Sequence, residues 1–106
     1  MKAIAIRLIT ITALLISSKV FAIEMPDLAK KYGCTGCHAI DKKLMGPAWQ
    51  EVANKYKGDS HAETKLNEKI ANGGSGVWGT MPMPAMSTVS DADRKTLISF
   101  ILGLAK

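Results

Sequence analysis

Two cysteines and a histidine lie together as Cys34-Thr35-Gly36-Cys37-His38, and the chain has no other cysteine. This order and spacing is the Cys-x-x-Cys-His pattern of c-type haem attachment. Each thiol can add to one of the two vinyl groups of a haem, and the adjacent imidazole can bind the iron. The small residues Thr35 and Gly36 let the backbone pass close to the haem edge. The motif therefore predicts one covalently bound haem c, with Cys34 and Cys37 as thioethers and His38 as an axial ligand.

Other interpretations of this motif require features that the rest of the sequence lacks. A thioredoxin-like redox pair belongs to a βαβ unit, and no strand pattern flanks the motif. A structural zinc site needs four ligands, and outside the motif the chain offers only His61 and carboxylates. A disulfide between the two cysteines is a third alternative, but it gives the adjacent histidine no role.

A haem iron bound by histidine on one face can take a methionine on the other, and the chain contains six methionines. The run Met81-Pro82-Met83-Pro84 is distinctive because proline fixes φ and holds the chain extended. Met83 has proline on both sides, so we predict it as the second axial ligand, with Met81 as the alternative. Isolated methionines more often fill apolar cores. The remaining candidates are Met25, Met45, which we expect near the haem, Met86, and His61, which we expect to be solvated.

The first 22 residues have the pattern of a secretory signal peptide. Lys2 and Arg7 give a basic start, residues 8–16 are largely apolar, and small or modest side chains precede the end at Ala22. We predict cleavage after Ala22, which leaves one domain of residues 23–106. The uninterrupted apolar stretch is far shorter than the ~20 residues of a membrane-spanning helix. We therefore expect no stable membrane insertion after cleavage, and an uncleaved anchor is the alternative.

The charge and the mode of haem attachment bear on compartment and partners. The formal net charge of +5 falls to +2 in residues 23–106, because three of the 14 basic residues and none of the 9 acidic ones lie in the predicted signal peptide. This modest charge gives no nucleic-acid signature. Covalent haem attachment takes place outside the cytoplasm, so we predict the bacterial periplasm. Lysines on polar faces could steer docking onto an acidic partner; they are Lys30, Lys31, Lys42, Lys43, Lys55 and Lys57.

The elements that position these residues are predicted from the spacing of apolar side chains. Intervals of three and four residues are typical of one helix face, and they recur in residues 25–32, 49–56, 66–70 and 97–105. Ser60 with Glu63 forms a capping box before the third of these helices, and a second capping signal begins at Ser90. We therefore expect four short helices.

Residues 73–89 contain four glycines and two prolines and show no helical period. We expect them to form a long ordered loop, which in a small domain is usually functional. This loop carries Met83. The predicted architecture is all-α, with about four short helices wrapped around one haem.

Taken together, these motifs resemble the small bacterial class I cytochromes c of the cytochrome c-551 type. The resemblance covers most of residues 23–106 and implies the class I cytochrome c fold. The haem motif alone indicates only a c-type haem, and the segment from Gly-Val-Trp-Gly to Met-Pro narrows the match to this group. The matching stretches are residues 33–41, 46–48, 70–73, 76–79 and 81–84, together with the last helix.

The resemblance assigns roles to matching positions. Met83 corresponds to the axial methionine, and Pro47 to the residue whose carbonyl accepts the Nδ1–H of the axial histidine and so orients the ring. Trp78 corresponds to an indole that donates to a haem propionate, and Lys69 stands where an arginine often pairs with that propionate. Met86 departs from the asparagine that often donates to the axial sulfur, and the loop after it is one residue longer.

Ligation by histidine and methionine leaves no open position on iron for a substrate. We therefore expect an electron carrier, and not an enzyme, that moves one electron by Fe(II)/Fe(III) cycling. The resemblance implies a quinol-oxidising complex as donor, and a terminal oxidase, a haem cd nitrite reductase or a peroxidase as acceptor. We expect a monomer. The alternative is a five-coordinate haem sensor or peroxidase-like protein, although the sequence shows no distal histidine or arginine suited to acid–base chemistry.

Overall fold

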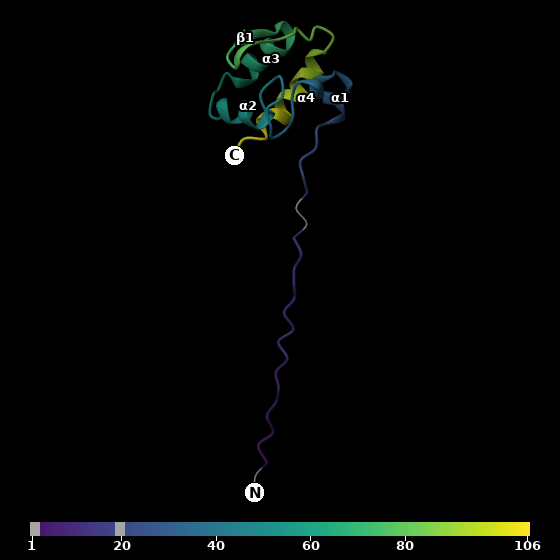
Figure 1. Ribbon diagram of the computed structural model, residues 1–106, viewed down its shortest axis with the longest axis vertical. Helices are drawn as coiled ribbons and strands as arrows, with labels where there is room; N and C mark the ends of the chain where they lie inside the picture. The colour runs from purple at the N-terminus through teal and green to yellow at the C-terminus, as the bar shows by residue number, and fades with distance from the viewer. Residues whose placement is uncertain (1–2, 19–20) are drawn as a thin grey trace.

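The computed structural model describes residues 3–18 and 21–106. Within these residues four α-helices pack together, and a small, largely exposed antiparallel strand pair lies at the edge of the body beside α3 (Figure 1). The four predicted helices are thus confirmed, and the strands are an addition to them. In chain order the elements are α1 (Asp27–Lys31), the 3-10 turn η1 (Cys34–Gly36), α2 (Trp49–Lys55), α3 (Ala62–Asn72), β1 (Gly74–Gly76), β2 (Gly79–Met83) and α4 (Asp91–Leu102).

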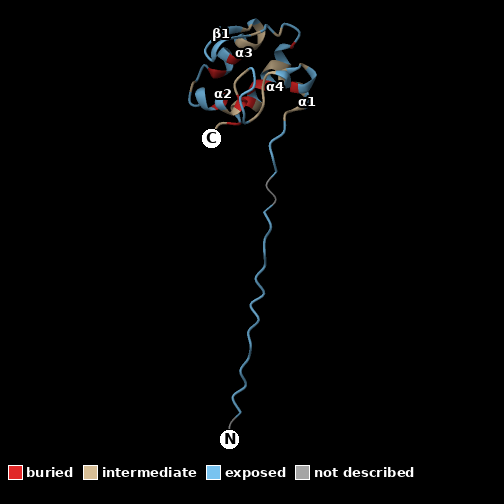
Figure 2. Ribbon diagram, viewed as in Figure 1, coloured by how far each residue is buried: buried red, intermediate tan, exposed pale blue. Residues whose placement is uncertain are grey.

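Residues 3–18 form no helix or strand and run away from the folded body as an exposed, extended chain (Figures 1 and 2). Their large apolar side chains contribute nothing to the core. Four residues of the predicted signal peptide, Met1, Lys2, Lys19 and Val20, lie outside the described residues. Across the described ranges, no helix combines the length and apolar character that crossing a membrane requires.

The core lies where α2 and α3 pack against α4. Leu97, Ile98 and Ile101 of α4 are buried among Val52 of α2 and Leu66 of α3. Figure 2 shows the buried positions gathered on the inward faces of the helices. The apolar faces predicted from helical spacing are therefore the faces that the fold buries.

The first and last helices of the domain are joined by a long-range hydrogen bond. The hydroxyl of Tyr32, just after α1, donates to Asp93 Oδ2 in the first turn of α4 at 2.5 Å. This bond to the carboxylate raises the pKa of Tyr32 above its ordinary value of 10.0. The contact fixes the segment that leads into the cysteine motif against the longest helix of the domain.

Of the two predicted helix caps, one is confirmed and one is wrong. Ser90 Oγ accepts a hydrogen bond from the Asp93 N–H at 3.2 Å, as a cap of α4 should. Ser60 caps nothing, because α3 begins at Ala62 with His61 in the N-cap position. The preceding turn begins at Asp59, whose carboxylate accepts the His61 N–H at 2.8 Å. Asp59 thus closes the turn before α3, and α3 itself has no side-chain cap.

The expected long loop over residues 73–89 is the main correction to the predicted fold. Its first half forms the antiparallel pair β1–β2, with Gly74 opposite Met83 and Gly76 opposite Gly79. Gly73 has φ +67, and a Cβ placed on it would lie 2.3 Å from the Met83 carbonyl oxygen. Glycine there lets the end of β2 run directly beside the end of α3.

Candidate haem site

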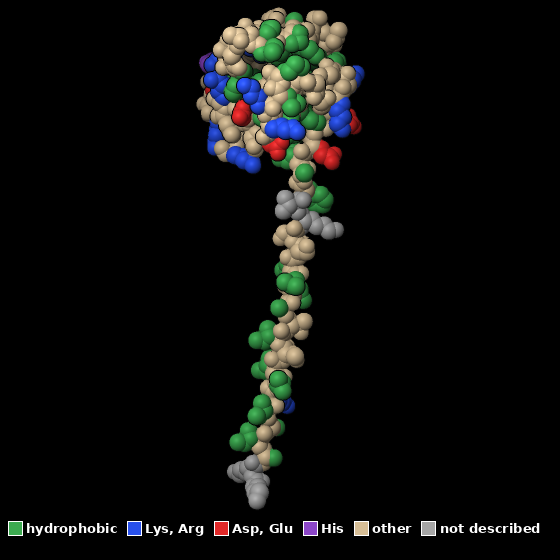
Figure 3. Space-filling view, in the orientation of Figure 1, with side chains coloured by type: hydrophobic (Ala, Val, Ile, Leu, Met, Phe, Trp, Pro, Cys, Tyr) green, Lys and Arg blue, Asp and Glu red, His purple; other side chains and the backbone are tan. Residues whose placement is uncertain are grey.

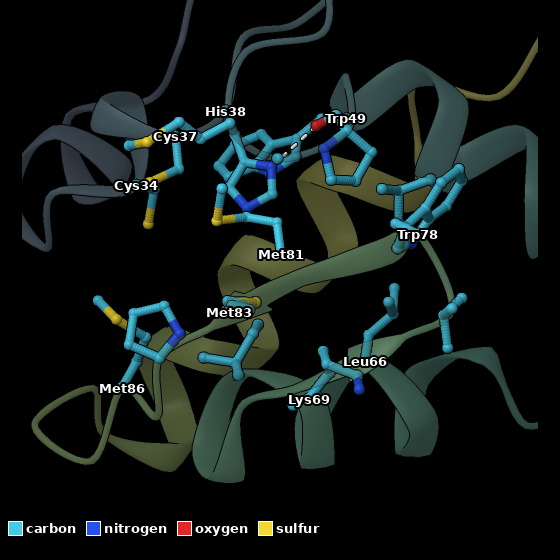
Figure 4. Close-up of a pocket in the computed structure, with 18 of the residues that line it drawn as sticks. Cys34, Cys37, His38, Trp49, Leu66, Lys69, Trp78, Met81, Met83 and Met86 are labelled. Atoms are coloured by element: carbon cyan, nitrogen blue, oxygen red, sulfur yellow. Dashed lines mark hydrogen bonds between the residues drawn. The ribbon is translucent and has the colours of Figure 1, made fainter.

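A cavity of about 440 Å³ opens between the cysteine motif, α3 and the strand pair. Its volume falls within the ~300–1,000 Å³ typical of ligand and cofactor pockets. Figure 4 shows the cysteines and His38 on one side and the β2 segment with its methionines crossing toward the other. The lining is mainly apolar, and it includes core residues such as Val52, Leu66, Leu97 and Ile101. The cavity is therefore continuous with the hydrophobic core.

Local backbone geometry brings the motif's three reactive side chains to this cavity. Gly33 has φ +75 and ends the first helix, so the chain turns at once into η1. The His38 N–H donates to the Cys34 carbonyl at 2.9 Å, which closes the turn. Cys34, Cys37 and His38 all line the cavity. Both cysteines are free thiols, and burial raises the pKa of the Cys34 thiol.

The imidazole of His38 is held in one orientation. Its Nδ1 lies 2.8 Å from the Pro47 carbonyl oxygen. A carbonyl can only accept, so Nδ1 carries the proton and Nε2 is left with its lone pair. The Trp49 ring packs at 5.9 Å between centroids. A Cβ on Gly46 would lie 2.6 Å from His38 Cε1, so the backbone also limits ring movement on that side. The ring is thus arranged to offer Nε2 to a metal.

The candidate axial ligands differ in whether they line the cavity. Met81, Met83, Met86 and Met45 line the cavity. Met25 packs against the core elsewhere, and His61 is exposed at the start of α3. Met83 is half-buried at the end of β2, whereas Met81 is 60% exposed. The structure thus brings the Met-Pro-Met-Pro run to the site and removes two of the six candidates from it.

The two other positions singled out from the sequence stand at the rim of the cavity. Trp78 lies in the turn between β1 and β2 and is 40% exposed. Lys69 lies on α3, with Nζ where a Cβ on Gly74 would come within 2.9 Å. Lys55 Nζ lies 5.5 Å from the centre of the Trp78 ring, within cation–π range. Sequence spacing gave no sign of this last contact, because the two residues belong to different elements.

The remaining residues singled out from the sequence lie at the cavity or on the surface of the folded body. Met86 is half-buried, and its N–H donates to the Ile70 carbonyl at 2.9 Å, which attaches the loop after β2 to α3. Met45 is 58% exposed at the cavity edge. Figure 3 shows basic and acidic side chains interspersed over the folded body. All the lysines considered for docking are exposed; they are Lys30, Lys31, Lys42, Lys43, Lys55 and Lys57.

The alternative uses of the cysteine motif find little support in the geometry. In the part of the chain that the structure describes, no three side chains among His, Cys, Asp and Glu are grouped as a metal would require. No βαβ unit surrounds the cysteines in these residues either. The cavity beside two free thiols and an oriented imidazole instead fits a porphyrin.

Comparisons with known proteins agree with the site. The sequence profile of the cytochrome c family matches residues 26–105. Cytochrome c-551 of Pseudomonas aeruginosa is 41% identical over 96% of this chain and 97% of its own length. Cytochrome c-551 of Allochromatium vinosum is 48% identical over 73% of this chain and 82% of its own. The crystal structure of Nitrosomonas europaea cytochrome c552 superimposes with a TM-score of 0.71 at 50% identity, covering 74% of this chain and 96% of that one.

The fold and the site define a class I cytochrome c with covalently bound haem c. The chain belongs to the cytochrome c family. It is a small electron carrier and not an enzyme.

Proposed function

We propose that the protein is a periplasmic single-haem carrier in which His38 and Met83 bind the iron from opposite faces. The observation that supports this most directly is the 2.8 Å contact between His38 Nδ1 and the Pro47 carbonyl. That bond leaves Nε2 as the metal-binding nitrogen of a residue that lines the cavity. Met83 lines the same cavity from β2 and supplies a thioether on the other side.

When bound, haem c supplies a one-electron Fe(II)/Fe(III) couple. The chain's own residues set the conditions for it. The soft sulfur of Met83 favours the ferrous state and raises the potential relative to harder ligands. Apolar side chains around the cavity disfavour the more highly charged ferric state. Occupation of both axial positions by side chains leaves none for a substrate, which suits electron transfer.

Two rim residues are proposed to hold the haem propionates. The indole N–H of Trp78 can donate to one propionate, and the Lys69 ammonium can supply charge to it, although without the planar fork of arginine. Lys55 above the Trp78 ring adds a second positive charge at this edge. These contacts would orient the haem plane relative to β2.

The location and partners follow from the same proposal. Residues 1–22 act as a signal peptide cut after Ala22, and residues 23–106 form the exported monomeric domain. A quinol-oxidising complex is the proposed donor, and a terminal oxidase, a haem cd nitrite reductase or a peroxidase the proposed acceptor. Exposed lysines near the haem edge would steer docking onto an acidic partner. Reduction rates that are independent of ionic strength would contradict the steering.

Two measurements on the periplasmically produced protein test the proposal: absorption spectra in the oxidised and reduced states, and the mass of the protein. We expect haem bands, a weak far-red methionine–Fe(III) charge-transfer band, and the mass of residues 23–106 plus one haem. A colourless protein with the bare polypeptide mass contradicts the haem assignment. Haem bands without the far-red band, together with rapid carbon monoxide binding, contradict methionine ligation and favour the five-coordinate alternative.

A further inference from the structure

Two methionines in β2 occupy equivalent positions in a repeated dipeptide. Met81 and Met83 are each followed by proline, and both line the cavity (Figure 4). Residues two apart on a strand face the same side. Each proline also lacks an N–H. A shift of β2 by two residues would therefore place a cavity-facing methionine and a following proline where the same pair had been.

The strand pairing shows where such a shift could be accommodated. Gly76 lies opposite Gly79, and Gly74 lies opposite Met83. On β1 a single residue lies between the two pairs, whereas on β2 three residues, 80–82, lie between them. The register is therefore irregular. Met81 is at the centre of these three residues and is highly exposed. The bulge thus gives β2 two more residues between the pairs than regular pairing requires.

Regular pairing would bring Met81 to the position that Met83 holds. If Gly76 stays opposite Gly79, an antiparallel ladder without a bulge places Met81 opposite Gly74. The required displacement is two residues, or about 7 Å along the strand. The two released residues would join the exposed segment that follows β2. The other methionines at the cavity lack this relation to the strand.

We propose that Met81 is a reserve axial ligand, which binds the iron when the Met83 thioether is unavailable. The inference rests on the proposed function, in which Met83 is the normal ligand. In the exchange, the Fe–S bond to Met83 breaks and an Fe–S bond to Met81 forms. One neutral thioether replaces another, so no electron or proton is transferred. The bulge around Met81 closes as the ligand changes.

Four variants of the full-length, periplasmically produced holoprotein test this inference. They are Met81→Ala, Met83→Ala, the double variant, and Met45→Ala as the control, since Met45 is a comparably exposed methionine at the same cavity. Covalent attachment through the cysteines keeps the haem on each variant, so spectra remain measurable even where an axial ligand is lost. The readouts are the far-red band of the ferric protein and the rate of carbon monoxide binding to the ferrous protein.

We expect Met81→Ala and Met45→Ala to keep the far-red band of the parent protein. Met83→Ala should keep a shifted band and bind carbon monoxide slowly, whereas the double variant should lose the band and bind carbon monoxide rapidly. If Met83→Ala loses the band as completely as the double variant, the reserve role is wrong while Met83 remains the ligand. If Met81→Ala loses the band and Met83→Ala keeps it unchanged, the assignment of Met83 itself is wrong, and the inference with it.

Discussion

Replacement of Gly73 by alanine should damage the site more than any other single methyl addition to its glycines. Gly73 has φ +67 and ψ −160 at the junction of α3 and β1. This region of backbone conformation is essentially restricted to glycine. A Cβ at this position would lie 2.3 Å from the Met83 carbonyl oxygen, 2.7 Å from the Ala85 nitrogen and 2.8 Å from the Pro84 carbonyl carbon. All three are backbone atoms, so no side-chain rotation relieves the overlap.

Two costs add in the Gly73→Ala variant. The unfavourable backbone conformation costs about 1–3 kcal/mol. Ordinary carbon contacts are about 3.5–4.0 Å, so the end of β2 must move by roughly 1 Å, and such overpacking costs about 1–3 kcal/mol. The expected loss in the free energy of unfolding is therefore about 2–6 kcal/mol, a large part of the ~5–15 kcal/mol typical of folded domains. The same movement displaces Met83 and should weaken or shift the far-red band.

Denaturant unfolding of the holoprotein measures this loss, with Gly58→Ala as the matched control. Gly58 has a similar φ of +78, but a Cβ there would meet no atom within 4 Å. The control should lose only the cost of a left-handed alanine, about 1–2 kcal/mol, and keep the far-red band. Equal losses in the two variants, or an unchanged band in Gly73→Ala, would refute the argument from close approach to β2.

Three further predictions concern the haem motif and the last helix. Gly46→Ala should lose about 1–3 kcal/mol in unfolding and shift the far-red band, because its Cβ would lie 2.6 Å from the motif's imidazole. Gly103→Ala is the control and should keep the band, because Gly103 lies outside the cavity with an ordinary φ of −67 and its Cβ would come no closer than 3.3 Å to any atom. Ser90→Ala should cost about 1 kcal/mol by removing the cap of α4, measured by thermal unfolding. Tyr32 has a raised pKa through its bond to Asp93, so that stabilisation is complete below pH 10.0 and is lost as pH rises through the folded-state pKa. Tyr32→Phe should remove this loss of stability at alkaline pH. If the variant still loses the same stability as pH rises, a group other than Tyr32 is responsible.

The helices and the haem attachment motif could be predicted because their signals are local. Trp49, Val52 and Ala53 follow helical spacing, and all three are buried in α2. The cysteine and histidine motif is a run of five residues whose order alone indicates its chemistry. A local pattern needs no knowledge of which distant segment packs against it.

The strand pair could not be predicted in the same way. Strands are usually recognised from alternating or β-branched residues, and β1 consists of Gly74, Ser75 and Gly76. Its pairing with β2 depends on a close approach that glycine permits, which is a property of the assembled structure. The Ser60 cap failed for a related reason, because a turn starting at Asp59 decides where α3 begins. Such choices depend on neighbours that a sequence pattern does not show.

Several side chains serve two regions of the domain at once. Trp49, Val52, Leu66, Leu97 and Ile101 belong to the hydrophobic core and also face the cavity. A polypeptide folded in this way before receiving its porphyrin would keep an open, water-accessible cavity of about 440 Å³ with a mainly apolar lining. Apolar surface left in water forgoes roughly 25 cal/mol per Å² of burial, which is a serious loss for a small domain whose whole stability is about 5–15 kcal/mol. Haem attachment and folding should therefore occur together. Molecules that receive no haem should remain unfolded and be degraded by proteases.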